Sequence, residues 1–253
     1  FSEASDALVN FAECLSLPVA TTLNGKSAFP EDHELSLGIG GFARAAYSSL
    51  PATKLAQNAD VILTIGCGFK RHATQVLPDQ AVRHIQIDID PKELNRDHLA
   101  EIAILGDARI VIQQMIDAAQ ATLGLDRLQR AETRYDDIGK LKAQWADLSA
   151  PLLTSAEVPI NPFRVTAELM KVVDPANTIL LHDAGTVRGT TSQHYMAPTP
   201  RSFIGFGVQS AMGWSTGAAM GAKKAYPEKL VVTIIGEEAF NETALDIETS
   251  VRN

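Results

Sequence analysis

Short apolar runs rich in β-branched residues alternate, along the first half of the chain, with segments whose apolar residues recur at helical spacing. The runs predict buried strands, and the segments between them predict amphipathic helices. Expected strands cover residues 18–22, 59–66, 83–90 and 102–105, and expected helices cover 2–15, 108–119 and a stretch opened by residues 38–41 that includes 43–50. Strands separated by helices favour βαβ units with a parallel sheet and right-handed crossovers.

The second half repeats this pattern after a charged, interrupted stretch. Asn161 and Pro162 are typical of a helix N-cap followed by proline at the first helical position. Beyond that helix, expected strands cover residues 178–182, 201–206 and 230–235, and a helix of small residues covers 211–225. We therefore predict an α/β fold with two doubly wound, Rossmann-like parallel-sheet units. The units span residues 1–125 and 157–253, and a helical connector spans 126–156.

Two carboxylates, Glu237 and Glu238, follow the last expected strand directly after Gly236. In an open α/β sheet, ligands bind at the carboxyl ends of the strands, which is where this turn lies. A carboxylate there can hold a hard cation, and the N terminus of the following helix can offer N–H groups to a phosphate. The alternative is a strand, a solvated acidic turn and a helix that bind nothing.

Charge and composition narrow the range of partners. The formal net charge is −8, and no run of basic residues offers a track for a phosphate backbone, so nucleic acid is not expected. No apolar run approaches the roughly 20 residues that cross a membrane. Cys14, Cys67 and the six histidines show no metal-ligand spacing, which favours reduced thiols in a cytoplasmic protein. The chain does not begin with Met, and we expect it to start inside a longer protein.

The last stretch resembles the diphosphate-binding motif of thiamine diphosphate (ThDP) enzymes, especially acetolactate synthase-like proteins. That motif opens with Gly-Asp-Gly or Gly-Asp-Ala after a strand, and it often continues as Ala-Phe-x-x-Thr, as residues 239–243 do here. Glu237 stands in place of the magnesium-binding Asp, and Glu238 in place of a Gly or Ala. The resemblance implies that Glu237 binds Mg²⁺ and that ThDP lies near Gly236, Glu238 and Ala239.

The resemblance extends through both halves of the chain and implies that both units are incomplete. Residues 17–26, 28–33, 59–60 and 88–91 resemble the middle domain of the family, and residues 158–253 resemble the start of its diphosphate-binding domain. By that similarity, Ala184, Gly185 and Thr186 line the diphosphate end of ThDP. Met212 matches the apolar residue that holds ThDP bent, although it could instead fill core space. Ser210 replaces a Gly whose carbonyl faces the aminopyrimidine.

Several family members also bind FAD in the middle domain. The matching positions in this chain are Leu23, Gly38, Gly66, Asp88, Ile89 and Asp107. An arginine-rich stretch usually follows the strand at 59–66, but only Arg71 stands near its place here. FAD is therefore left open, and it is less favoured than ThDP.

These resemblances imply a portion of a ThDP- and Mg²⁺-dependent enzyme that decarboxylates a 2-keto acid and joins the product to an acceptor, as acetolactate synthase-like transferases and lyases do. Its expected partners are a small-molecule 2-keto acid and further copies of a longer chain. No catalytic residue is assigned, because the family's proton-relaying Glu belongs to another domain, and we expect the chain alone to be inactive. The alternative is a non-catalytic or degenerate nucleotide-binding module that keeps the fold.

Overall fold

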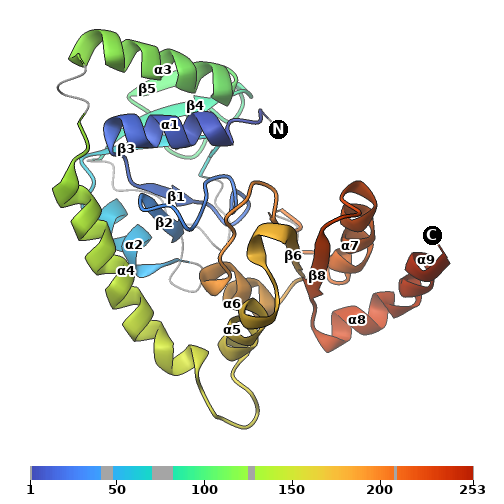
Figure 1. The fold of residues 1–253 in the computed structure, drawn as a ribbon. Helices are drawn as coiled ribbons and strands as arrows, with labels where there is room; N and C mark the ends of the chain where they lie inside the picture. The colour runs from blue at the N-terminus through green and yellow to red at the C-terminus, as the bar shows by residue number, and fades with distance from the viewer. Residues whose placement is uncertain (1, 41–47, 70–81, 125–128, 208–209, 253) are drawn as a thin grey trace. The chain divides into compact units, whose positions relative to one another are not determined.

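The computed structural model describes residues 2–40, 48–69, 82–124, 129–207 and 210–252 (Figure 1). The chain divides into two compact units. Unit 1 comprises Phe1–Thr22 and His33–Trp145, and unit 2 comprises Leu23–Asp32 and Ala146–Asn253. The predicted domain limits at 125 and 157 remain predictions.

Unit 1 is built from parallel strands and the helices that connect them. Its elements are α1 (Ser5–Leu15), β1 (Val19–Thr21), β2 (Ser36–Ile39), α2 (Leu50–Gln57), β3 (Val61–Ile65), β4 (Arg83–Asp88), β5 (Ile102–Leu105), α3 (Ala108–Leu123) and the first part of α4 (Glu132–Leu153). One sheet has the order β1-β2 and the other β3-β4-β5, and every pairing is parallel. The predicted α/β class with parallel sheets is confirmed.

The core of unit 1 lies where α1 and α3 meet β3. Phe11 from α1 and Ile112 and Ile116 from α3 are buried together, and Leu63 and Ile65 of β3 pack against them. Figure 1 shows α1 and α3 running side by side. The start of α3 is fixed by Asp107, whose carboxylate accepts hydrogen bonds from the first-turn amides, as expected for an N-cap.

The strand β2 corrects one expectation, because residues 38–41 were predicted to open a helix. Instead residues Ser36–Ile39 form a strand that pairs in parallel with β1, and Ser36, Leu37 and Ile39 are buried. Gly38 has a φ of +74°, which a non-glycine residue rarely adopts, and its N–H donates to the Ser36 hydroxyl. The predicted helical stretch continued through residues 43–47, which lie outside the described residues.

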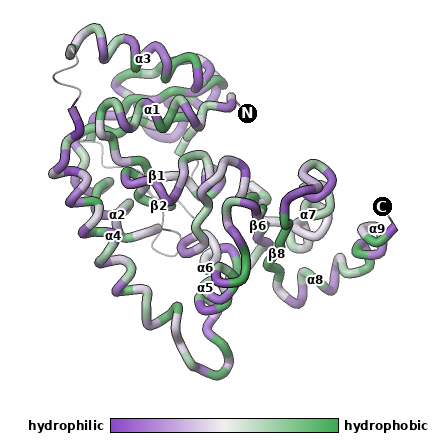
Figure 2. The backbone as a smooth tube through the Cα atoms, in the orientation of Figure 1, coloured by the Kyte–Doolittle hydropathy of each residue, from purple (hydrophilic) through white to green (hydrophobic). Residues whose placement is uncertain are grey.

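Unit 2 contains a further parallel sheet, with the order β7-β6-β8. Its elements are the end of α4, then α5 (Pro162–Val172), η3 (Pro175–Asn177), β6 (Thr178–His182), α6 (Thr186–His194), β7 (Phe203–Ile204), α7 (Trp214–Ala225), β8 (Leu230–Ile234), α8 (Glu237–Thr243), η4 (Ala244–Asp246) and α9 (Ile247–Arg252). Every residue of β6 is buried. The tube in Figure 2 is green along β8, where Leu230 is exposed and the other residues are half-buried, and it is mixed in colour along α4.

The segment Leu23–Asp32 packs within unit 2, although it is far from the rest of that unit in sequence. Glu31 donates its backbone N–H to the carbonyl of Ala197 (3.3 Å) and accepts the Ala197 N–H with its side chain (2.8 Å). Lys26 forms a buried ion pair with Glu31, and its Nζ lies 5.1 Å from the centre of the Phe203 ring. These contacts hold the segment Leu23–Asp32 next to β7.

Every helix among the described residues is too short or too polar to span a lipid bilayer.

Two histidines that are 14 residues apart meet in unit 1. The Nδ1 atoms of His84 and His98 lie 3.3 Å apart, and His84 Nε2 lies 2.8 Å from the hydroxyl of Thr64. The Phe69 ring is in contact with both imidazoles. Burial lowers the pKa of His84, the neighbouring His98 lowers it further, and a backbone hydrogen bond at Leu99 opposes these effects.

We therefore predict that acid destabilises unit 1. An unfolded histidine takes up a proton below a pH of about 6.5, whereas folded His84 does so only at a lower pH, so the unfolded state binds more protons between these values. Protection of the β4 amides against hydrogen exchange, corrected for intrinsic rates, should fall between pH 7.5 and 5.5. His98→Asn should reduce this fall, and an unchanged pH dependence in that variant would contradict the assignment.

Candidate cofactor site

The carboxyl ends of β6 and β8 meet at one edge of the sheet in unit 2. The two strands pair in parallel from Thr178 with Leu230 to His182 with Ile234, and the N–H of Asp183 continues the ladder by donating to the Ile234 carbonyl (3.0 Å). The turn after β6 and the turn after β8 are therefore neighbours. This is the position at which open α/β sheets bind ligands.

Asp183 ties this edge to the start of α7. Its side chain is completely buried. One carboxylate oxygen accepts from the N–H groups of Ala184 (2.8 Å) and Gly213 (3.0 Å), and the other accepts from the N–H of Ser215 (2.9 Å). Burial alone would raise the pKa of Asp183, but the hydrogen bonds from Ser215, Ala184 and Gly213 hold it below its usual value.

The start of α7 is in turn packed against α8. Gly213 has a φ of +76°, and a Cβ at this position would lie 2.4 Å from Cγ2 of Thr243. The hydroxyls of Thr216 and Thr243 are 2.9 Å apart, and the Thr243 hydroxyl donates to the Ala239 carbonyl (3.1 Å). Only a glycine at 213 allows this close approach.

The structure places the predicted site residues in three segments near this edge. After β6, Ala184 is half-buried, and Gly185 and Thr186 are exposed at the start of α6. Before α7, Ser210 and Met212 are exposed, Met212 by 48%. After β8, the exposed Glu237 and Glu238 form the first turn of α8, with Gly236 before them, whereas the Ala239 side chain is only 4% exposed and packs internally.

These positions fit part of a magnesium diphosphate site. Glu237 offers an exposed carboxylate, and Mg²⁺ in proteins is commonly held by one or two carboxylates, phosphate oxygens and water. Within the described residues, no group of three or more His, Cys, Asp or Glu side chains is placed to hold a metal by itself. Glu237 could therefore act as one ligand among several.

Sequence reasoning did not single out Asp183 as a site residue. The local signal is a carboxylate directly after the expected strand at 178–182 and before Ala184 and Gly185. Its partners Gly213 and Ser215 lie 30 and 32 residues away. Such a separation leaves no periodic trace in the sequence.

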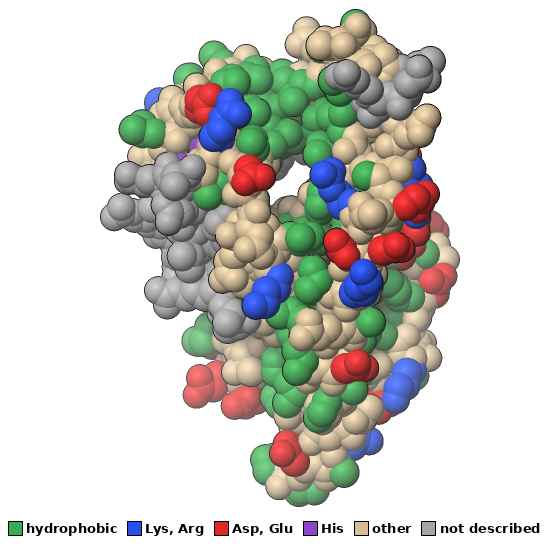
Figure 3. Space-filling model, turned by 90° about the vertical axis from the view of Figure 1, so that its left-hand side faces the viewer, with side chains coloured by type: hydrophobic (Ala, Val, Ile, Leu, Met, Phe, Trp, Pro, Cys, Tyr) green, Lys and Arg blue, Asp and Glu red, His purple; other side chains and the backbone are tan. Residues whose placement is uncertain are grey.

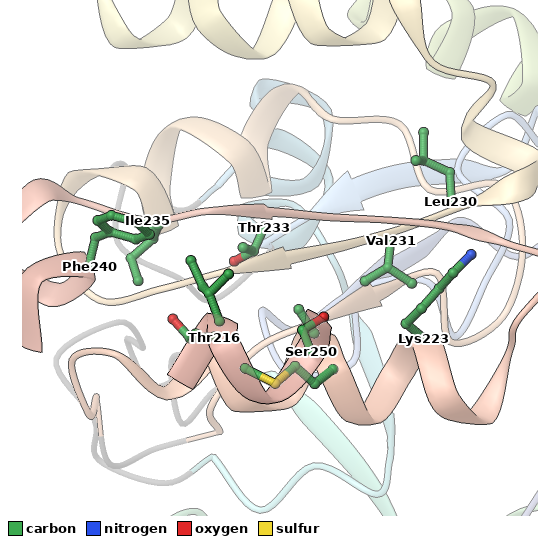
Figure 4. A pocket seen from close by; sticks show the side chains of 11 residues that line it. Thr216, Lys223, Leu230, Val231, Thr233, Ile235, Phe240 and Ser250 are labelled. Atoms are coloured by element: carbon green, nitrogen blue, oxygen red, sulfur yellow. The ribbon is translucent and has the colours of Figure 1, made fainter. Parts of the chain in front are cut away.

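A cavity of about 330 Å³ lies between α7 and β8 (Figure 4). Its lining includes Thr216 and Met220 from α7, Val231 and Thr233 from β8, and Phe240 from α8. The Nζ of Lys223, also in the lining, donates to the carbonyls of Pro227 and Lys229. Because the lining is mainly apolar, the cavity is better matched to an apolar group than to a charged diphosphate.

The close contact at Gly213 yields a stability prediction. Gly213→Ala should reduce the free energy of unfolding by about 2–4 kcal/mol, because the new methyl group overlaps Thr243 and φ is positive. Chemical denaturation followed by circular dichroism measures this change.

Gly217 provides the matched control in the same helix, since a Cβ there meets nothing within 4 Å. Gly217→Ala should stabilise the chain by about 0.5–1 kcal/mol through helix propensity. Equal effects of the two substitutions would contradict the packing described at Gly213.

Comparison with known proteins shows the family to which the chain belongs. The family model described as thiamine pyrophosphate enzyme, central domain, matches residues 1–115, and the model described as thiamine pyrophosphate enzyme, C-terminal TPP binding domain, matches residues 183–253. Thiamine pyrophosphate is another name for ThDP. The chain therefore belongs to the thiamine pyrophosphate enzymes.

Within that family, the chain is similar to large subunits of acetolactate synthase. It is 34% identical to a probable large subunit from Methanocaldococcus jannaschii, over 98% of this chain and 41% of that protein. A probable large subunit from Methanococcus aeolicus is 30% identical, over 94% of this chain and 40% of that protein. The isozyme 3 large subunit of Escherichia coli is 29% identical, over 95% of this chain and 41% of that protein. The chain thus spans about two fifths of these relatives.

Proposed function

We propose that this chain is the central and cofactor-binding portion of a ThDP- and Mg²⁺-dependent enzyme that decarboxylates a 2-keto acid and transfers the product to an acceptor. The observation that carries the proposal is the meeting of three segments (residues 184–186, 210–212 and 236–239) at the carboxyl edge of one parallel sheet. The family matches and the names of the acetolactate synthase relatives support the reaction class.

Within this portion, each segment has a distinct task. Backbone groups of Ala184, Gly185 and Thr186 would hold the diphosphate, and Glu237 would hold the Mg²⁺. Met212 and Ser210 contact the rings of the cofactor. ThDP, when bound, supplies the electron sink for decarboxylation, whereas the protein supplies binding and orientation.

The partners and the compartment follow from the same proposal. The substrate is a small 2-keto acid, and the longer protein assembles with copies of itself in the cytoplasm. On the face drawn in Figure 3, basic side chains are interspersed with acidic ones, which supports the expectation that nucleic acid is not a partner. Whether the chain binds FAD remains open, because Arg71, which stands near the place of the family's arginine-rich stretch, lies outside the described residues.

A degenerate nucleotide-binding module is the second candidate. The observation in its favour is the acidic turn, where Glu237 and Glu238 are both exposed at the N terminus of α8 and replace the expected Asp and small residue. Two negative charges there oppose a diphosphate unless a cation is bound.

Glu237→Asp tests the metal assignment. Mg²⁺ tolerates misplaced ligands poorly, and an Asp restores the side-chain length typical of the family. The variant should therefore bind ThDP severalfold more tightly in the presence of Mg²⁺, as measured by isothermal titration calorimetry. Weaker binding of ThDP by Glu237→Asp would count against Glu237 as the metal ligand.

Glu238→Ala tests the electrostatic cost of the second carboxylate. Removing this charge should tighten binding of Mg²⁺ and ThDP by about two- to fivefold at low ionic strength, and by less in high salt. Glu242→Ala, which removes an exposed charge near the other end of α8, is the matched control. If both variants shift the affinity equally, a local effect of Glu238 is excluded.

A further inference from the structure

We propose that Asp183 is a positioning residue for the cofactor: its carboxylate holds the turn after β6 and the start of α7 in the arrangement that places residues 184–186 and 210–212 against ThDP. This inference rests on the proposed function, since it concerns the segments assigned there to the diphosphate and the rings. It adds a residue that does not itself contact the cofactor.

The hydrogen bonds of Asp183 define one rigid junction. The N–H of Asp183 donates to the Ile234 carbonyl of β8. Its carboxylate accepts from the N–H of Ala184 in the turn after β6 and from the N–H groups of Gly213 and Ser215 at the start of α7. The strand β8, the turn after β6 and the start of α7 are therefore fixed to a single residue. Ala184 and Gly213 are also the immediate neighbours of the proposed cofactor contacts Gly185 and Met212.

Asp183 also performs the N-capping of α7. The N-cap residue Gly213 has no side chain to accept hydrogen bonds from the first N–H groups of the helix, although its carbonyl accepts the N–H of Thr216 (3.2 Å). Asp183 accepts two of them, which is what an N-cap Asp ordinarily does from within its own helix. Its negative charge lies beside the positive end of the α7 dipole, which is a favourable interaction. The N–H groups of Gly213 and Ser215 are therefore already paired, and a phosphate would have to bind other groups along this edge.

The geometry at Asp183 requires a carboxylate. In Asp183→Asn, the remaining oxygen could keep the bonds from Ala184 and Gly213, but the new NH₂ group would face the N–H of Ser215. Two donors would then oppose each other in a buried position, so α7 must shift. Asp183→Ser keeps one oxygen acceptor and provides a second, smaller variant in case Asp183→Asn fails to fold.

Asp174 offers a matched control in the same unit. It is exposed and caps η3, where its carboxylate accepts from the Ala176 N–H (3.0 Å) and from the Asn177 side chain (2.6 Å). Asp174→Asn thus removes a capping carboxylate that is not bonded to the predicted cofactor segments. Both substitutions should lower the Tm, but only the one at position 183 should alter the site.

The experiment measures ThDP affinity in excess Mg²⁺ by titration calorimetry of the 253-residue chain, well below the Tm of each variant. Amide NMR signals of Gly213 and Ser215 report the junction independently of ligand. We expect Asp183→Asn to weaken ThDP binding by at least about tenfold, the scale set by losing a hydrogen bond to a charged group, and to shift both amides. Asp174→Asn should leave the affinity within about twofold.

Each outcome bears on a different claim. If the unaltered chain binds ThDP and the folded variants at position 183 bind it equally well, Asp183 is purely structural and the inference is wrong. If the unaltered chain does not bind ThDP, the proposed function is wrong for this chain, and the positioning role is overturned with it. Weakened binding in the variants at 183, but not at 174, supports the inference.

Discussion

Parallel pairing of β6 with β8 is the constraint on which the site depends. Because both strands run in the same direction, their carboxyl ends and the turns that follow them must lie at one edge. The sequence places a carboxylate after each strand, Asp183 after β6 and Glu237 after β8. Asp183 is buried and used to hold α7, whereas Glu237 is exposed and available to a ligand. A carboxylate thus serves packing in one turn and presents charge in the other.

Local patterns in the sequence predicted most strands and the start of several helices. The strand at 102–105 and the strand at 178–182 were predicted to the residue, because short apolar runs bounded by polar residues leave little choice. The helix expected at 211–225 begins at Trp214, since the positive φ of Gly213 cannot continue into the helix. The strand β2 was missed because the glycine-rich residues 38–41 were interpreted as the start of a helix.

What the sequence could not predict are contacts between distant segments. The bonds from Asp183 to Gly213 and Ser215, the meeting of His84 with His98, and the packing of Leu23–Asp32 into unit 2 all join residues whose separation is set by the fold. The family resemblance located the candidate site because it carries such long-range information. It did not explain how the segments are held together, which the hydrogen bonds of Asp183 do.

The negative charges at this edge make the proposed binding of ThDP depend on a cation. Three carboxylates, those of Asp183, Glu237 and Glu238, lie in the turns where a diphosphate is proposed to bind, so binding without a cation would place like charges together. The most direct measurement is a ThDP titration of a Trp145→Phe chain, in which Trp214 at the start of α7 is the remaining tryptophan, with Mg²⁺ and with EDTA. The account predicts saturable quenching with Mg²⁺ that disappears in EDTA and in Glu237→Ala. Equal quenching with Mg²⁺ and with EDTA, or quenching that survives in Glu237→Ala, would contradict it.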